Sequence, residues 1–277
     1  MTYQTLELKT LTPHIGAEVA GVDLSRPLSN EQFSELYQAW LDWKVLVFRN
    51  QQLDAQQHKD FARRFGSLHV HPMQHSYGGD PNILRVKTTS ESKYTAGNGW
   101  HTDVTCDEIP PLGSMLYMKE TPLDGGGDTL FADMYLAYDL LSETMQQTLS
   151  DLVAIHDGAL PYQGSYGVAP PSNEQYPRNE HPVITVHPET GKKVLYVNSG
   201  FTARIKGMHS WESRMLLQGL FQQIATEVRL PCRVSWEPNT LTFWDNRCTQ
   251  HHAIWDYYPN SRYGERVSIV GEQRPAA

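Results

Sequence analysis

The stretch CRVSWEPNTLTFWDN, residues 232–246, contains two short runs that are typical of β-strands. Both runs are rich in β-branched and aromatic residues, and Pro238 with Asn239 predicts a turn between them. Similar runs occur elsewhere: NILRVKT (82–88), SMLYMK (114–119), DTLFA (128–132), VITVH (183–187), KVLYVN (193–198) and RVSIV (266–270). Because these runs do not alternate regularly with helical segments, a doubly wound parallel sheet is disfavoured. The sequence predicts a mainly β protein with flanking helices, either a β-sandwich or a jelly roll.

The helical segments show apolar residues at helical spacing. In the segment over residues 29–43, Ser29 and Gln32 have the spacing of a capping box. In the segment over residues 54–66, Asp54 is the expected N-terminal cap and Gly66 is the expected end of the helix. The predicted helices cover residues 29–43, 54–66, 141–152 and 210–227, and a strand over residues 44–50 separates the first two.

Composition limits the classes of function. The 277 residues carry 23 Lys and Arg against 31 Asp and Glu, a net charge of −8. An acidic chain is a poor general binder of nucleic acid or of anionic membranes, so neither is expected as a partner. No internal repeat or linker divides the chain, which predicts a single catalytic domain over residues 1–277. The Pro-, Gly- and Tyr-rich stretch at 161–182 is expected to be a lid or binding loop.

The cellular compartment is predicted from the cysteines and from the apolar runs. The three cysteines are an odd number and include no CxxC motif, which indicates a reducing environment. The first residues lack the basic and apolar regions of a signal peptide. No run of about 18 apolar residues is present, so no membrane span is expected. The predicted location is the cytoplasm.

A candidate metal site begins at His101-Thr102-Asp103. If this segment is extended, side chains two residues apart share a face, and His101 and Asp103 can bind one metal ion. His251 or His252, just after the strand-like TLTFW, can supply a third ligand. Two histidines and a carboxylate leave open positions on an octahedral metal and are typical of non-haem Fe(II) oxygenases. The alternative is that His101 is an ordinary hydrogen-bonded or surface histidine.

A second metal hypothesis concerns HVHPMQH, residues 69–75. His69 and His71 lie two residues apart and can share a strand face as zinc ligands of a hydrolase. The HxHxDH pattern of metallo-β-lactamase-type hydrolases has an aspartate where this chain has Met73, and His75 comes one place too late. This mismatch makes the hydrolase the weaker hypothesis.

Two arginines lie four apart near the end of the chain. In a strand, Arg262 and Arg266 share a face, and Gly264 is expected to leave space between them. A planar guanidinium suits a carboxylate or a sulfonate. The pair therefore predicts a site for two anions, whereas the simpler alternative is a pair of surface salt bridges.

With these features the chain resembles the taurine dioxygenase family of Fe(II)- and 2-oxoglutarate-dependent oxygenases, which is related to the alkylsulfatase and aryloxyalkanoate dioxygenases. The matching motifs span almost the whole chain: HIGAEVAGVDLSRPLS (14–29), FGSLHVHP (65–72), WHTDVT (100–105), PLDGGGDTLFAD (122–133), VNSGFTARI (197–205) and WDNRCTQHHA (244–253), followed by R-x3-R. The resemblance implies a double-stranded β-helix, a cupin-like jelly roll. It also implies Fe(II), 2-oxoglutarate and O2 as cofactor and cosubstrates, and a homo-oligomer, either a dimer or a tetramer.

The resemblance also assigns roles at the reaction centre. His101, Asp103 and His251 match the family's iron ligands, since the family's histidine directly follows the TQ pair. Arg262 matches the arginine that pairs with the distal carboxylate of 2-oxoglutarate, and Thr129 matches the threonine that supports the same carboxylate.

For the substrate, Arg266 matches the arginine that takes its acidic group. His71 and Phe201 match positions of the substrate pocket. The family's asparagine four residues before the first ligand is replaced by Gly97, and the adjacent Asn98 is expected to take its place.

Two further departures concern the pocket: Gln74 stands at a family tyrosine, and Gly158 at a family aromatic residue. With Gly97 they are expected to enlarge the pocket. The predicted function is hydroxylation of a small organic acid, a sulfonate such as taurine or a bulkier analogue, with release of succinate and CO2. The alternatives are the same chemistry on an alkyl sulfate or aryloxyalkanoate, or a non-catalytic metabolite-binding member.

Overall fold

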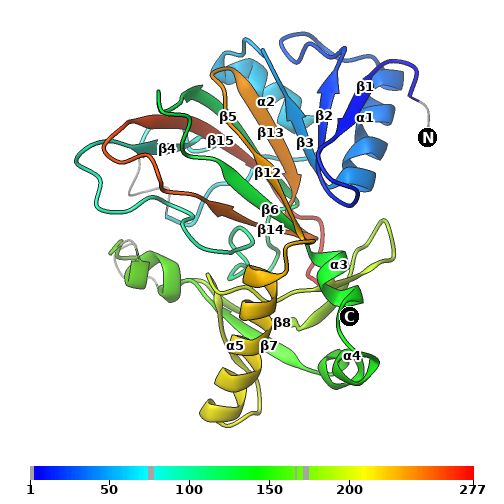
Figure 1. The fold of residues 1–277 in the computed structure, drawn as a ribbon, viewed down its shortest axis with the longest axis vertical. Helices are drawn as coiled ribbons and strands as arrows, with labels where there is room; N and C mark the ends of the chain where they lie inside the picture. The colour runs from blue at the N-terminus through cyan, green and yellow to red at the C-terminus, as the bar shows by residue number, and fades with distance from the viewer. Residues whose placement is uncertain (1–2, 74–77, 166, 171–174) are drawn as a thin grey trace.

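The largest element of the structure is a seven-stranded sheet, which lies in the upper half of Figure 1. The computed structural model describes residues 3–73, 78–165, 167–170 and 175–277. The strands of this major sheet are, in spatial order, β1 (Glu7–Thr10), β2 (Ala17–Ala20), β3 (Val45–Phe48), β13 (Thr240–Asp245), β5 (Gly113–Glu120), β15 (Arg262–Ile269) and β4 (Leu84–Thr88). Neighbours pair antiparallel except β2 with β3, which pair parallel.

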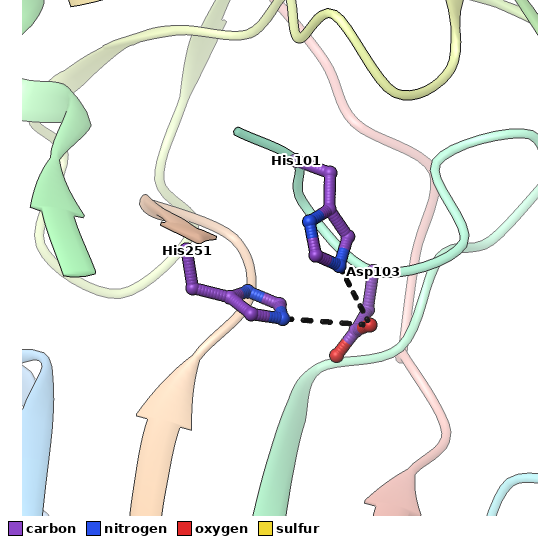
Figure 2. Close-up of side chains that lie close together, drawn as sticks. All are labelled: His101, Asp103 and His251. Carbon is purple, nitrogen blue, oxygen red and sulfur yellow. Dashed lines mark ion pairs between the residues drawn. The ribbon is translucent and has the colours of Figure 1, made fainter. Parts of the chain in front are cut away.

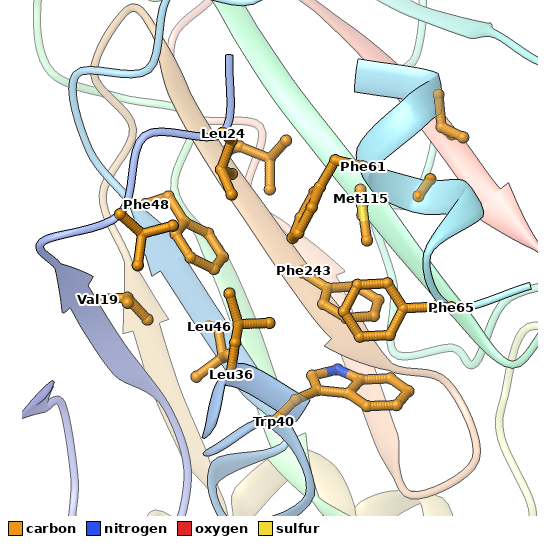
Figure 3. Close-up of a cluster of buried hydrophobic side chains, with 14 of the residues drawn as sticks. Val19, Leu24, Leu36, Trp40, Leu46, Phe48, Phe61, Phe65, Met115 and Phe243 are labelled. Carbon is orange, nitrogen blue, oxygen red and sulfur yellow. The ribbon is translucent and has the colours of Figure 1, made fainter. Parts of the chain in front are cut away.

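The major sheet is covered on both faces, as strand β3 shows. All four of its residues are fully buried, and they alternate between two apolar clusters. Leu46 and Phe48 face a cluster beneath helices α1 (Asn30–Trp43) and α2 (Ala55–Arg63), drawn in Figure 3. There Trp40 of α1 stacks on the β13 ring of Phe243 with the ring centres 4.4 Å apart. The two helices therefore anchor the back of the sheet.

The other face of the major sheet packs on a second, three-stranded sheet. This minor sheet has the order β12 (Pro231–Val234), β6 (Thr129–Asp133) and β14 (Thr249–Ala253). Val45 and Val47 of the major sheet share a buried cluster with Phe131 of β6. Two facing sheets with helices on the outside confirm the predicted jelly roll, and they leave room between them for a site.

A third group of elements lies in the lower half of Figure 1 around its own apolar cluster. It contains a sheet of β11 (Thr202–Ile205), β7 (Val153–Asp157) and β8 (Arg178–Pro182), the pair β9 (Ile184–Val186) and β10 (Lys193–Leu195), and helices α3 (Met134–Asp139), α4 (Glu143–Ser150) and α5 (Ser210–Thr226). Among the described residues, no helix is both long enough and apolar enough to cross a bilayer.

The predicted helix starts are confirmed. The Ser29 side chain accepts from the backbone N–H of Gln32, and Asp54 forms a complete capping box with Gln57. Helix α2 ends at Arg63, before the expected stop at Gly66. Helix α3 was not predicted, since its six residues span too few turns to show a period.

The expected loop over residues 161–182 is wrong at both of its ends. A π-helix, η2 (Leu160–Ser165), covers its start, and strand β8 covers its end. Residues 166 and 171–174 lie outside the described residues. A lid function for this segment stays a prediction, as does the single catalytic domain over residues 1–277.

Candidate active site

A cavity of about 680 Å³ lies between the two facing sheets. Its wall takes residues from β6 and from β5, β13 and β15 on the opposite side, and from loops at one end. Every side chain predicted for the site lines this one cavity: His71, Asn98, His101, Asp103, Thr129, Phe201, His251, Arg262 and Arg266. Residues spread from 71 to 266 in the sequence therefore meet at one place.

The possible metal ligands converge at the cavity floor. The Nε2 atoms of His101 and His251 each lie 3.9 Å from Oδ1 of Asp103, and all three side chains point toward one another (Figure 2). Their ligand atoms lie within 4.8 Å of one another. His251, not His252, belongs to this group, which agrees with the assignment made from the family motif.

Hydrogen bonds tie each residue of the first ligand segment to the segment that carries the other histidine. His101 and His251 exchange backbone hydrogen bonds of 3.0 and 2.8 Å. The Thr102 hydroxyl donates to the carbonyl of Thr249. The Asn246 side chain, at the end of β13, accepts from the Asp103 N–H at 2.8 Å and donates to the Asp103 carbonyl at 2.9 Å.

The ligand segment is less extended than expected. His101 sits in an isolated β-bridge, but a turn begins at Asp103, and Val104 has a positive φ of 49°. The extended backbone considered for the His101-Thr102-Asp103 segment therefore holds only as far as Thr102. The two side chains still converge because Asn246 fixes the backbone of Asp103 at the start of the turn.

We expect Asn246→Ala to weaken metal binding by about 10- to 100-fold, the usual effect of removing a residue that orients a ligand. The variant loses both hydrogen bonds to the Asp103 backbone, so the carboxylate is no longer held beside the histidines. Calorimetric titration of the purified protein with Mn(II) measures the change. Asn260→Ala, which removes only an exposed pair with Asp124, is the matched control. Equal Mn(II) affinity in the two variants would contradict the orienting role.

Protonation in the site favours metal binding. Burial lowers the pKa of both His101 and His251, so both imidazoles are neutral at neutral pH. Burial alone would raise the pKa of Asp103, but the charge of Arg266, helped by the Ser114 hydrogen bond, outweighs it and holds that pKa below its usual range. Two neutral imidazoles and one carboxylate are ready to bind a cation without releasing a proton.

The donor set fits a divalent ion such as Fe(II). His101 Nδ1 lies 2.9 Å from the Gly99 carbonyl, and donation to that oxygen leaves the Nε2 lone pair free to face the ion. Two ligand atoms at right angles, each about 2.1 Å from one ion, lie about 3 Å apart, so small side-chain rotations close the set. A 2-His-1-carboxylate set with open positions is typical of non-haem Fe(II) oxygenases.

A second group of potential ligands, His187, Asp245 and Cys248, also lies within 4.8 Å. Its carboxylate is already satisfied, because Asp245 accepts two hydrogen bonds from the Arg247 guanidinium and pairs with His187 Nε2 at 3.1 Å. A cation placed there would lie beside a permanent positive charge. This group is therefore structural.

Arg262 is a buried cation with no carboxylate partner among the described residues. It is 3% exposed, and its Nε and Nη2 atoms have no hydrogen-bond partner. Burial lowers its pKa, although a guanidinium stays charged at any usual pH. Gly127, with φ +85°, makes room for it, since a Cβ there would lie 3.0 Å from Arg262 Cδ. A buried unpaired charge is costly, so this arrangement calls for an anion in the cavity.

Arg266 lies nearer the candidate metal ligands. Its Nη1 atom donates to Asp103 Oδ1 at 2.5 Å, and its buried Nε atom has no partner. Both arginines thus face the same cavity, as predicted, and neither forms a surface salt bridge. Gly264 does not open a space between them, because it packs against Leu116 and Tyr117 of β5.

The predicted substrate positions differ in their surroundings. Phe201 is buried in the cavity wall. Burial, with Arg266 nearby, lowers the pKa of His71 to about 3, so its ring is neutral. Asn98 is exposed at the rim, and its Oδ1 lies 3.1 Å from His252 Nε2.

The positions that depart from the family pattern differ in where they lie relative to the cavity. Gly97 lines the cavity, and a Cβ there would lie 3.1 Å from the His101 ring. Gly158 lies outside the lining, but a Cβ there would press on the ring of Tyr162, which does line the cavity. Gln74 lies outside the described residues.

The zinc alternative gains no support from the described residues. His69 pairs with Asp107 at 3.1 Å, and His71 faces the cavity, so the two do not join a group of three ligands. His75 lies outside the described residues.

Sequence reasoning missed three residues at the site. Asn246 looked like a turn residue after a strand, and Ser114, which donates to Asp103 Oδ2 at 3.0 Å, looked like an ordinary strand residue. Trp236 looked like an apolar strand end, yet it lines the cavity. The WDN motif was the available signal for Asn246, whereas the contacts of Ser114 and Trp236 depend on the fold.

Comparisons with known proteins agree with this geometry. The model of the family described as "Taurine catabolism dioxygenase TauD, TfdA family" matches residues 7–268. An alkylsulfatase of Acinetobacter baylyi is 36% identical over 97% of this chain and 86% of that protein. An alpha-ketoglutarate-dependent sulfonate dioxygenase of Saccharomyces cerevisiae is 34% identical over 97% of this chain and 68% of that protein. The crystal structure of a taurine dioxygenase from Burkholderia xenovorans superposes with a TM-score of 0.84 at 33% identity, covering 97% of this chain and 90% of that one.

A family model that spans nearly the whole chain, relatives above 30% identity and a shared fold all lead to one assignment. The chain belongs to the TauD/TfdA family and is an Fe(II)- and 2-oxoglutarate-dependent dioxygenase that uses O2.

Proposed function

We propose that the protein hydroxylates a small organic acid, a sulfonate such as taurine or a bulkier analogue, and that its site residues act as the sequence predicts. One observation carries the proposal: the three candidate metal ligands, the buried Arg262 and the partly buried Arg266 face the same cavity. An ion and two separate anions can therefore be held together, which matches a metal, a 2-oxo dicarboxylate and an acidic substrate.

In the proposed site, His101, Asp103 and His251 hold the iron. Bound Fe(II) and 2-oxoglutarate supply the oxidative decarboxylation that yields succinate and CO2 and delivers one oxygen atom of O2 to the substrate. The protein's contribution is to position these groups. Ser114 and Arg266 each donate to one Asp103 oxygen, which fixes the plane of the carboxylate.

Arg262 and Thr129 hold the distal carboxylate of 2-oxoglutarate. Arg262 is buried and has no carboxylate partner among the described residues, so a bound carboxylate would pair with its charge. Thr129 is also buried and lines the cavity. The cosubstrate is thereby oriented with its 2-oxo acid end free to face the ligands.

Arg266 binds the acidic group of the substrate through its unpaired Nε–H. Because Arg266 also contacts Asp103, the bound acid lies close to the metal ligands, and a neighbouring C–H is within reach of the reaction. The apolar wall, including Phe201 and Tyr162, excludes water. If the hydroxylated carbon carries a sulfonate, sulfate or aryloxy group, the product collapses to a carbonyl compound and releases sulfite, sulfate or a phenol.

A panel of sulfonates, sulfate esters and aryloxy acids tests this proposal. With Fe(II), 2-oxoglutarate and air, we expect one class to raise succinate formation at least about tenfold over the substrate-free rate, because correct positioning accelerates the coupled reaction. Arg266→Gln should lose this stimulation while still binding 2-oxoglutarate. A protein that binds 2-oxoglutarate but never forms succinate would instead be the non-catalytic metabolite-binding member.

The proposal includes a cytoplasmic location and a homo-oligomer, a dimer or tetramer. The buried free thiols Cys106, Cys232 and Cys248 support a reducing compartment. Light scattering on the purified protein measures the oligomeric state.

A further inference from the structure

Trp236 contacts both residues of the proposed carboxylate clamp, which is the pair Thr129 and Arg262 that would hold the distal carboxylate of 2-oxoglutarate. It follows β12, is 8% exposed and lines the cavity. Its indole Nε1–H donates to the Thr129 hydroxyl oxygen at 3.0 Å, and the Arg262 guanidinium lies over its ring, 5.5 Å from the ring centre. Trp236, Thr129 and Arg262 come from three separate segments of the chain, so the tryptophan joins the two halves of the clamp.

The hydrogen bond sets the direction of the Thr129 hydroxyl. An indole N–H can only donate, so the hydroxyl oxygen must accept from Trp236. The hydroxyl hydrogen then stays available for another acceptor. A carboxylate is an acceptor without hydrogens of its own, so it fits the end of this donor chain, and each bond in the chain strengthens the next.

The ring of Trp236 acts on the other half of the clamp. Arg262 has no hydrogen-bond partner at Nε or Nη2, so hydrogen bonds from these atoms do not fix its orientation. A guanidinium within about 6 Å of an indole ring centre is attracted to the ring face. The indole therefore helps to hold a buried cation in place before any anion arrives.

We infer that Trp236 is a positioning residue for the cosubstrate, acting through Thr129 and Arg262 to select a 2-oxo acid with a second carboxylate. The inference rests on the proposed function of these two residues. It predicts that changing Trp236 weakens the binding of the distal carboxylate and leaves the binding of the 2-oxo acid end unchanged.

The test compares the binding of 2-oxoglutarate with that of 2-oxobutyrate, which lacks the distal carboxylate. Titration calorimetry on the full chain loaded with Mn(II) measures both affinities without turnover. Trp236→Phe keeps an aromatic ring and removes the N–H, and we expect 2-oxoglutarate to bind about five- to tenfold more weakly, the effect of one hydrogen bond. The affinity for 2-oxobutyrate should stay within about twofold.

A double-mutant comparison isolates the hydrogen bond. Trp236→His keeps an N–H at the matching ring position and loses most of the ring face. Thr129→Val should therefore weaken 2-oxoglutarate binding when added to Trp236→His, but should have a much smaller effect when added to Trp236→Phe. Thermal denaturation checks that each variant folds. If one of the two Trp236 variants fails to fold, the affinities of the other variant for 2-oxoglutarate and 2-oxobutyrate decide whether the inference holds.

The outcomes separate this inference from the proposed function. If Trp236→Phe lowers the affinity for 2-oxoglutarate and for 2-oxobutyrate by the same factor, or changes neither affinity, the positioning role is wrong. If the unaltered protein itself shows no preference for 2-oxoglutarate over 2-oxobutyrate, the assignment of Arg262 and Thr129 fails instead.

Discussion

Asp103→Ala should abolish substrate-dependent succinate formation, with metal affinity reduced by more than about 100-fold, beyond the usual effect of losing a residue that only orients a ligand. The carboxylate is the only anionic member of the proposed ligand set, and its two oxygens are held by Ser114 and Arg266. Without it, a cation would face two neutral imidazoles beside an arginine. Mn(II) calorimetry and succinate assays with excess Fe(II) measure the two effects.

Asp107→Ala is the matched control for this change. Asp107 lies on the same loop and pairs with His69, outside the cavity lining. It should retain metal affinity and turnover. Full activity of Asp103→Ala with iron supplied would show that Asp103 is not a ligand.

Arg262→Met should have opposite effects on cosubstrate binding and on stability. Losing one partner of a buried charge pair costs about 3–5 kcal/mol, so 2-oxoglutarate should bind at least about 100-fold more weakly. The protein without cosubstrate should become more stable, because a buried and unpaired cation is removed. Thermal denaturation with and without 2-oxoglutarate measures both: the melting temperature of the unaltered protein should rise strongly with the ligand, and that of the variant should not.

Arg229→Met provides the comparison, since Arg229 is an exposed arginine paired with Glu227. We expect almost no change in stability and an unaltered response to 2-oxoglutarate, because exposed ion pairs contribute little. If Arg262→Met lowers the melting temperature of the ligand-free protein and keeps the full response to 2-oxoglutarate, Arg262 is a structural residue.

Local sequence patterns were sufficient for much of the fold and the site. Strand runs such as Thr240–Trp244 and the caps at Ser29 and Asp54 depend on neighbouring residues, so they could be predicted. The pairing of His101 with Asp103 followed from their close spacing and from the family motif. In each of these features the residues involved are close in sequence. Helix and strand propensity and periodicity act over such short separations.

The features that were missed depend on long-range contacts. The Arg266–Asp103 contact joins residues 163 positions apart, and the Trp236–Thr129 bond joins residues 107 apart. The turn that begins at Asp103, with a positive φ at Val104, is held by hydrogen bonds from the distant Asn246 to the Asp103 backbone. No window of sequence contains both partners of such contacts, so only the folded chain shows them.

The exchange of backbone hydrogen bonds between His101 and His251 has a consequence for protein engineering. It ties the candidate metal ligands to the sheets, whereas another part of the cavity lining comes from the loops around residues 93–100 and 199–201 and from the start of η2 at residues 160–162. These lining segments can therefore vary while the candidate ligands and Arg266, which sits on β15, stay in place. Loops grafted from a relative with another substrate range should change which acids are accepted, while the reaction itself is inherited from the unaltered frame.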